Sequence, residues 1–179
     1  AHAERDGDPL LAIEAFERVE GDGAVDSEDR RRARMRLREL YGQTGNHDKL
    51  EGLLEAELSR GDLSGAALAR AGRDLAALLA TRGKPERALT VLEEALRSVP
   101  RDLGLLEDMA TLARQARDGA RRAAALGTLV DLVSDRARAK VLRELAPLLE
   151  VLGDVAGATG RFQELSALDP NDVDALSAL

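Results

Sequence analysis

Few side chains of this sequence are of the types that catalyse reactions. The internal histidine, His47, is followed by Asp48, but neighbours in a helix point in different directions, so the pair lacks the geometry of a general base and its orienting carboxylate. The 179 residues include no cysteine, which excludes a thiolate nucleophile and a cysteine-based zinc site. No serine occupies a Gly-x-Ser-x-Gly turn. We therefore predict that the protein is not an enzyme.

The sequence also contains no recognisable set of ligands for a metal ion or a cofactor. Loop carboxylates occur without the alternating spacing and terminal glutamate of a calcium loop; they are Asp6, Asp8, Asp22 and Asp26. Several glycines fall within helical patterns rather than in a phosphate-binding loop, and we expect them to allow close helix contact; they are Gly104, Gly127, Gly157 and Gly160. We predict no metal and no cofactor.

The overall charge and hydropathy exclude two further classes. The formal net charge is −7, whereas a general nucleic-acid binder needs positive charge to neutralise phosphates. Hydrophobic runs are short and interrupted by charged residues, so we expect no membrane insertion. We favour a soluble, cytoplasmic protein, although no residue fixes the compartment.

The hydrophobic pattern is typical of helices. Aromatic residues make up 2% of the chain and hydrophobic residues 44%, so leucine, valine and alanine must fill the core, which suits closely packed helices. Leu68, Leu75 and Leu79 recur at helical spacing, and leucines between residues 142 and 152 repeat the pattern. The sequence predicts an all-α protein with helices over residues 9–20, 27–44, 47–59, 63–82, 85–98, 102–117, 119–133, 135–152, 155–168 and 172–179.

Glycines at regular intervals mark the turns between these helices. Gly7, Gly45 and Gly83 are 38 residues apart, and Gly153 follows after 70 residues. A degenerate turn is expected between the last two glycines, near Asp118. Repetition at such a period is typical of a protein built from stacked helix hairpins.

The residues around two of these turns resemble the signature of the tetratricopeptide repeat family, whose period is about 34 residues. One set is Leu75, Ala76, Leu79, Gly83, Ala88, Leu92, Ala95 and Pro100. The other set is Leu145, Ala146, Leu149, Gly153, Ala158, Phe162, Leu165 and Pro170. The resemblance implies a right-handed solenoid of stacked antiparallel hairpins, in which the small residues let the paired helices approach closely.

The resemblance covers nearly the whole chain and implies one continuous array over residues 1–179, as a fragment of a longer repeat protein. It places hairpins at about 27–59, 63–98, 102–133 and 135–168, with partial repeats at 1–20 and 171–179. The apolar side of the C-terminal partial repeat has no polar capping helix, so self-association through this end is expected.

Two repeats depart from the family pattern, and one proline lies inside a predicted helix. Arg38 replaces the small residue in the repeat around Gly45. The repeat that contains Met109 fits poorly, and its turn is shifted by about one residue. Pro147 lies inside a predicted helix, where it removes a backbone hydrogen bond, so a kink is favoured over two shorter helices.

In the family the exposed face of each first helix lines a concave groove. The resemblance places seven basic residues there and only three acidic ones (Glu39, Glu107 and Glu150), which is an excess of positive charge in an acidic chain. The basic residues are Arg32, Arg36, Arg70, Arg73, Arg114, Lys140 and Arg143. The alternative is a solvated face whose arginines pair with nearby carboxylates.

These features favour a protein-interaction module or scaffold segment that binds a peptide or partner protein in the groove, and the excess of positive charge suits an acidic one. No asparagines accompany the basic residues, so the family's clamp for chaperone tails is not expected. A structural or assembly spacer within a long solenoid, without a dedicated ligand, is the other function that the sequence allows.

Overall fold

The computed structural model describes residues 8–178, which form ten α-helices and no β-strand. Gly7, assigned above to the first turn, and the loop carboxylate Asp6 lie outside the described residues. The all-α prediction is confirmed, and the predicted and observed helices correspond one to one. The helices are α1 Pro9–Gly21, α2 Ser27–Gln43, α3 His47–Ser59, α4 Gly65–Thr81, α5 Pro85–Ser98, α6 Leu103–Gln115, α7 Gly119–Val130, α8 Asp135–Val151, α9 Val155–Leu168 and α10 Val173–Ser177.

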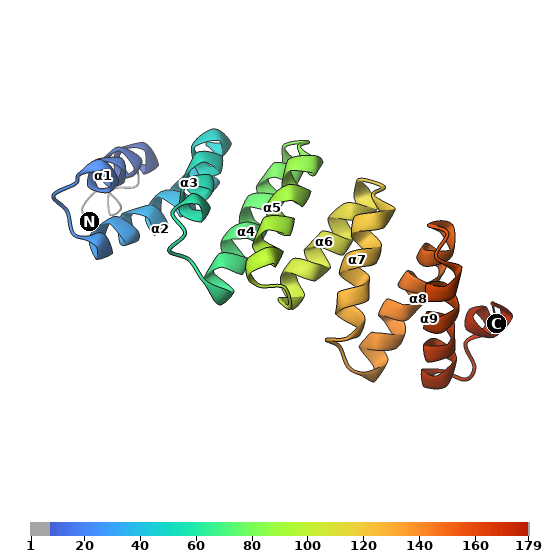
Figure 1. Cartoon of the computed structure of the whole chain (residues 1–179). Helices are drawn as coiled ribbons and strands as arrows, with labels where there is room; N and C mark the ends of the chain where they lie inside the picture. The colour runs from blue at the N-terminus through green and yellow to red at the C-terminus, as the bar shows by residue number, and fades with distance from the viewer. Residues whose placement is uncertain (1–7, 179) are drawn as a thin grey trace. The chain divides into compact units, whose positions relative to one another are not determined.

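The chain divides into two compact units, Ala1–Leu63 and Ser64–Leu179. In the first unit α2 packs against both α1 and α3. In the second unit the hairpins α4–α5, α6–α7 and α8–α9 follow one another, each packing on the next, and α10 packs on α9 (Figure 1). A single continuous array over the whole chain stays a prediction.

The hairpin turns share one hydrogen-bond pattern. At the α4–α5 turn, Gly83 has a φ of +71° and the next residue, Lys84, donates its N–H to the Leu79 carbonyl at 2.9 Å. Gly45 and Gly153 hold the same place at the turns after α2 and α8, with φ of +67° and +84°. Glycine suits this place because a left-handed φ brings no steric cost when there is no Cβ.

Arg117 takes the glycine place at the α6–α7 turn. Its φ is +59°, and the following residue, Asp118, donates to the Ala113 carbonyl at 2.8 Å. The Asp118 carboxylate then accepts the N–H of Arg121 and caps α7. The turn predicted near Asp118 is therefore one residue earlier and built on a non-glycine residue, which explains why the glycine pattern is interrupted there.

Replacing Arg117 with glycine is expected to raise the free energy of unfolding by about 0.5–1 kcal/mol, measured by urea denaturation. The left-handed conformation costs a non-glycine residue about 1–2 kcal/mol, and the greater entropy of glycine in the unfolded chain offsets part of that gain. Arg101→Gly is the control, because Arg101 lies in a loop and is not among the described residues with positive φ. A loss of stability from Arg117→Gly would contradict this account of the turn.

The core of the second unit consists of leucines and alanines on facing helices. Leu79 and Leu89 are fully buried, and so are the four small residues that the resemblance placed between paired helices: Ala76, Ala88, Ala146 and Ala158. At Gly72 a Cβ would lie 2.9 Å from the Cβ of Ala95, which shows how closely α4 approaches α5. Alanine and glycine at these positions allow that approach.

The expected role of the other helical glycines was wrong in part. Gly127 and Gly160 have open space where a Cβ would lie, and Gly157 faces the capping carboxylate of Asp154 in its own helix. Only Gly104 is crowded by another helix, because the Arg73 guanidinium lies over it.

The structure accommodates both Pro147 and Arg38 within the helices predicted for them. Helix α8 continues through Pro147 as one element rather than two. Arg38, in place of a small residue, reaches across from α2 to Glu57 of α3 at 3.6 Å. The hairpin architecture therefore tolerates both residues.

Candidate functional site

The first helices of the second unit, α4, α6 and α8, line two neighbouring hollows. The first hollow, of about 300 Å³, lies between α4 and α6 over Leu92 of α5. The second, of about 520 Å³, lies between α6 and α8 over Leu126 and Leu129 of α7. Asp108 and Thr111 of α6 contribute to both. We call these two hollows together the groove.

The first hollow has a mainly apolar surface. Its α4 side consists of Ala76, Ala77 and Ala80, whose short side chains leave the space open. Leu92 and Leu112 are buried beneath it. Such a surface can receive an apolar side chain of a ligand and remove it from water.

The second hollow contains three acidic and two basic residues, but two of the acids are already neutralised. Asp108 accepts a hydrogen bond from Arg73 at 2.6 Å, and Glu144 accepts one from Arg122 at 2.6 Å. Within the described residues, Glu107, Arg114 and Lys140 have no hydrogen-bonded or ion-paired side-chain partner. Two positive charges therefore oppose one negative charge, and the hollow favours an anionic group.

Arg73 and Arg143 both form ion pairs with carboxylates of segments that follow later in the chain. Arg73 of α4 binds Asp108 of α6, and Arg143 of α8 binds Asp169 and Asp172, in the segment between α9 and α10, at 2.6 Å each. Hydrogen bonds to these carboxylates raise the pKa of both guanidinium groups. Counted from Gly83 and Gly153, the two arginines occupy the same place in their hairpins, although their partners occupy different places.

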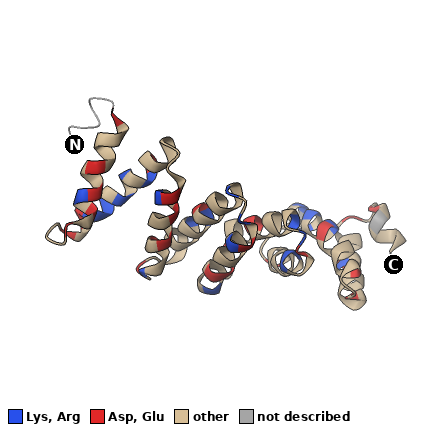
Figure 2. Ribbon diagram, turned by 90° about the horizontal axis from the view of Figure 1, so that it is seen from above, with Lys and Arg blue, Asp and Glu red and all other residues tan. Residues whose placement is uncertain are grey.

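The other predicted groove residues are distributed over both units. In the first unit, Arg32 pairs with Glu28 and Asp29, and Arg36 binds Glu39 at 2.7 Å, all along α2. In the second unit Arg70 lies 3.9 Å from Asp74 on α4. Figure 2 shows basic and acidic residues interspersed along the helices. Of the seven predicted residues, the structure brings only Arg114 and Lys140 together as unpaired cations in one hollow, and the role of all seven in binding stays a prediction.

Sequence reasoning missed a polar cluster in the first unit. The Tyr41 hydroxyl of α2 donates to the Glu17 carboxylate of α1 at 2.7 Å, and Lys49 of α3 binds the same carboxylate. The hydrogen bond from Lys49, then that from Tyr41, lowers the pKa of Glu17, while burial raises the pKa of Tyr41. The cluster ties three helices together. The only sequence feature that could have indicated this cluster is that Tyr41 is the one tyrosine of the chain.

The two side chains considered above for general-base chemistry and the possible metal ligands can be located in the described part of the chain. His47 is exposed at the start of α3. Between residues 8 and 178, no three histidine or acidic side chains are grouped as metal ligands. No helix described by the structure has the length and apolar character needed to cross a membrane.

Comparison with known proteins identifies the repeat. The sequence model of the tetratricopeptide repeat family matches residues 69–112, which cover most of α4, all of α5 and most of α6. These helices supply the walls of the first hollow. No curated protein sequence matches the chain.

Several solved structures share the fold. A tetratricopeptide repeat protein from Parabacteroides merdae matches 97% of this chain and 65% of its own, with 16% identity and a TM-score of 0.60. BtubC from P. vanneervenii matches 98% and 76%, with 18% identity and a TM-score of 0.57. YrrB, described as a tetratricopeptide repeat protein with an unusual peptide-binding site, matches 82% and 72%, with 14% identity and a TM-score of 0.51. At these identities the likeness concerns the fold alone.

Proposed function

We propose that this chain, which contains a tetratricopeptide repeat and has the fold of tetratricopeptide repeat proteins, is a protein-interaction module that binds an acidic peptide in the groove between α4, α6 and α8. The observation that carries the proposal is the charge in the second hollow. Arg114 and Lys140 remain unpaired there after Arg73 and Arg122 have neutralised two of the three acids.

The two hollows suit different parts of one extended peptide. A carboxylate can bind between Arg114 and Lys140, where the planar guanidinium offers two parallel hydrogen bonds. A neighbouring apolar side chain of the peptide can then lie over Ala77 and Ala80 in the first hollow. The lining residues are held on helices, so little conformational entropy is lost when the peptide binds.

The affinity for an acidic peptide should fall as salt concentration rises. We expect several-fold weaker binding of a fluorescein-labelled, glutamate-rich peptide when ionic strength increases from about 0.05 to about 0.3 M, because exposed charges are screened within about 10 Å at 0.1 M. Fluorescence anisotropy measures this directly. A peptide with glutamine in place of each glutamate is the control, and equal affinities for the two peptides would contradict the proposal and favour a spacer without a dedicated ligand.

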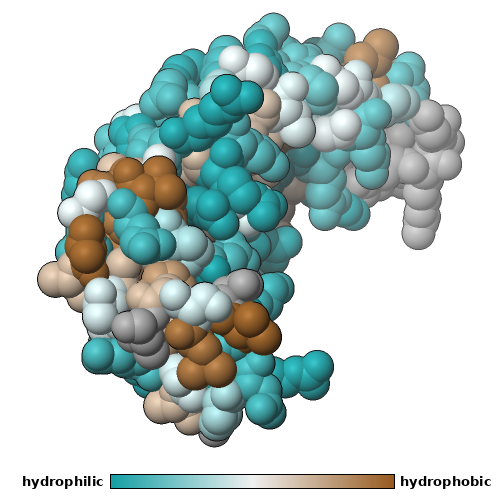
Figure 3. Space-filling model, turned by 90° about the vertical axis from the view of Figure 1, so that its right-hand side faces the viewer, coloured by the Kyte–Doolittle hydropathy of each residue, from teal (hydrophilic) through white to brown (hydrophobic). Residues whose placement is uncertain are grey.

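We infer in addition that the chain self-associates through its C-terminal end, formed by α8, α9 and α10. Apolar side chains gather on this end (Figure 3), where Val151, Val155 and Val173 are 84%, 65% and 73% exposed. Contact between two copies would remove this apolar surface from water. Sedimentation equilibrium should show a concentration-dependent dimer that the double change Val151→Asp with Val155→Asp abolishes. A wild-type chain that stays monomeric at high concentration would contradict this inference.

A further inference from the structure

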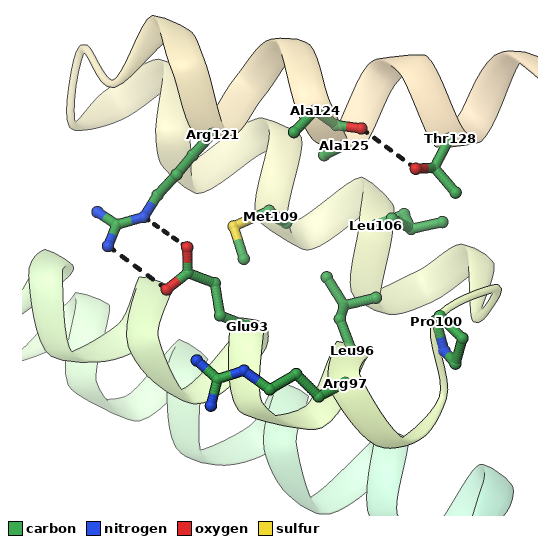
Figure 4. Close-up of a pocket in the computed structure, with 10 residues that line it drawn as sticks. All are labelled: Glu93, Leu96, Arg97, Pro100, Leu106, Met109, Arg121, Ala124, Ala125 and Thr128. Atoms are coloured by element: carbon green, nitrogen blue, oxygen red, sulfur yellow. Dashed lines mark hydrogen bonds and ion pairs between the residues drawn. The ribbon is translucent and has the colours of Figure 1, made fainter.

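A third hollow lies on the other side of α6 from the groove, between the second helices α5 and α7 (Figure 4). Its volume is about 440 Å³. The lining includes Leu96 of α5, Pro100 of the following turn, and Leu106 and Met109 of α6. Met109 and Leu106 are 3% exposed, so the floor is part of the hydrophobic core surface rather than a gap between polar side chains.

Two residues of α7 that line this hollow are uncharged, whereas the corresponding residues of α9 carry an ion pair. Counted from the turn residues Arg117 and Gly153, Ala125 corresponds to Arg161 and Thr128 corresponds to Glu164. Arg161 donates a hydrogen bond to Glu164 at 2.8 Å, and Glu164 also accepts one from Arg138. Alanine at residue 125 and threonine at residue 128 cannot form this ion pair, and both line the hollow.

The charges at the rim determine which ligand fits. Arg121 donates two hydrogen bonds to Glu93, at 2.8 and 3.4 Å, and it also binds Glu86 and Asp118. These carboxylates are therefore occupied, and so is Arg121. Arg97 is exposed and has no ion-paired or hydrogen-bonded side-chain partner among residues 8–178. Arg97 is therefore the cation of the rim that a ligand can pair with. Together with the apolar lining, it favours a ligand that carries a carboxylate beside an apolar group.

We propose that this hollow, between α5 and α7, is a second docking site, which takes a segment of a partner protein that presents a leucine-like side chain next to an acidic residue. The apolar side chain lies on Met109 and Leu106, and the carboxylate pairs with Arg97. The site is separate from the groove, because α6 offers it Leu106 and Met109 and offers the groove Asp108, Thr111 and Arg114. It therefore does not depend on the acidic-peptide proposal made above.

The two methionines of the chain make the test direct. With ¹³C-labelled methionine methyl groups, Met109 reports on the hollow, and Met35, exposed on α2 in the first unit, is the internal control. We expect the peptide acetyl-Ser-Leu-Glu-Leu-Glu-Ser-amide to shift the Met109 signal in a saturable way and to leave Met35 unchanged. Arg114→Glu combined with Lys140→Glu, in the groove, should leave the Met109 response intact.

Two variants and a matched control define the site further. Arg97→Glu should weaken the Met109 response about tenfold, because it replaces an attraction by a repulsion. Arg101→Glu, the same charge change on a residue that does not line the hollow, should change it less than about threefold. Ala124→Trp, at an exposed position of the rim, should fill the space and abolish the response while the circular dichroism spectrum stays helical.

Equal shifts at Met109 and Met35, no saturable shift at Met109, or equal losses from Arg97→Glu and Arg101→Glu would overturn the inference. A Met109 signal that moves with protein concentration in the absence of peptide would assign the hollow to a second copy of the chain, and it would overturn the inference as well.

Discussion

Replacing Leu75 with alanine is expected to lower the free energy of unfolding by about 2–5 kcal/mol. Leu75 of α4 is 2% exposed, and Leu145, which corresponds to it in α8, is 1% exposed. Each change removes buried methyl groups and leaves a cavity between tightly packed helices, which relax only partly. Urea denaturation followed by circular dichroism at 222 nm measures the effect, and Leu145→Ala should give a loss of similar size.

The control for these core changes is Leu10→Ala at the start of α1. Leu10 is 64% exposed, so its truncation should alter stability by less than about 0.5 kcal/mol. Losses of that small size from Leu75→Ala and Leu145→Ala would show that the leucine pattern does not mark the core of the hairpins.

The second large effect is expected on binding. Changing Arg114 and Lys140 together to glutamate should weaken an acidic peptide at least about tenfold, and up to about a hundredfold, because each change converts an attraction into a repulsion. Both side chains are exposed and form no ion pair within the described residues, so the fold should be retained. Fluorescence anisotropy gives the affinities, and thermal denaturation verifies that the variant is folded.

The control pair is Arg101→Glu with Arg136→Glu. It changes the net charge by the same amount at two exposed arginines that do not line the groove. A twofold to threefold loss from this pair is compatible with general electrostatic attraction. Equal losses from the two pairs would mean that the attraction is diffuse and that the groove is not the binding site.

Arg73 and Arg143 are unsuitable for the same test, although the sequence places them on the basic face. Their carboxylate partners lie 26 to 35 residues further along the chain, on α6 for Arg73 and between α9 and α10 for Arg143. Charge reversal there would break contacts between segments that are distant in the sequence, so a loss of binding could follow from a loss of stability. The residue type at a position gives its charge. Which carboxylate neutralises that charge depends on how the helices pack, and the sequence alone does not give this.

The fold was predictable because its determinants are local. Leu75 and Leu79 mark the buried face of one helix, and Gly83 and Gly153 mark turns that follow the same rule. The α6–α7 turn was misplaced by one residue because its left-handed position carries Arg117, and no glycine signals it. A weak local pattern therefore cost accuracy at that turn, and the predicted end of α7 at residue 133 lies beyond its observed end at Val130.

For the candidate site, the sequence predicted the helix face on which it lies but not which of its charged residues are ion-paired. Residue spacing placed Arg114 and Lys140 on first helices, but it could not show that Asp108 and Glu144 in the same hollow are neutralised by Arg73 and Arg122. The hollow between α5 and α7 also escaped prediction. Its α7 side is lined in part by Ala124 and Ala125, and an alanine in a helical pattern carries no signal of its own.

The central claim, that an acidic peptide binds in the groove, is tested most directly by locating the bound peptide. The chain has no cysteine, so a nitroxide spin label can be attached at a single introduced cysteine. Thr111→Cys places the label in the groove, whereas Thr90→Cys places it on the exposed surface of α5. We predict strong paramagnetic broadening of the peptide's NMR signals with the label at residue 111 and little with the label at residue 90. Equal broadening from both labels, or stronger broadening from residue 90, would contradict the claim.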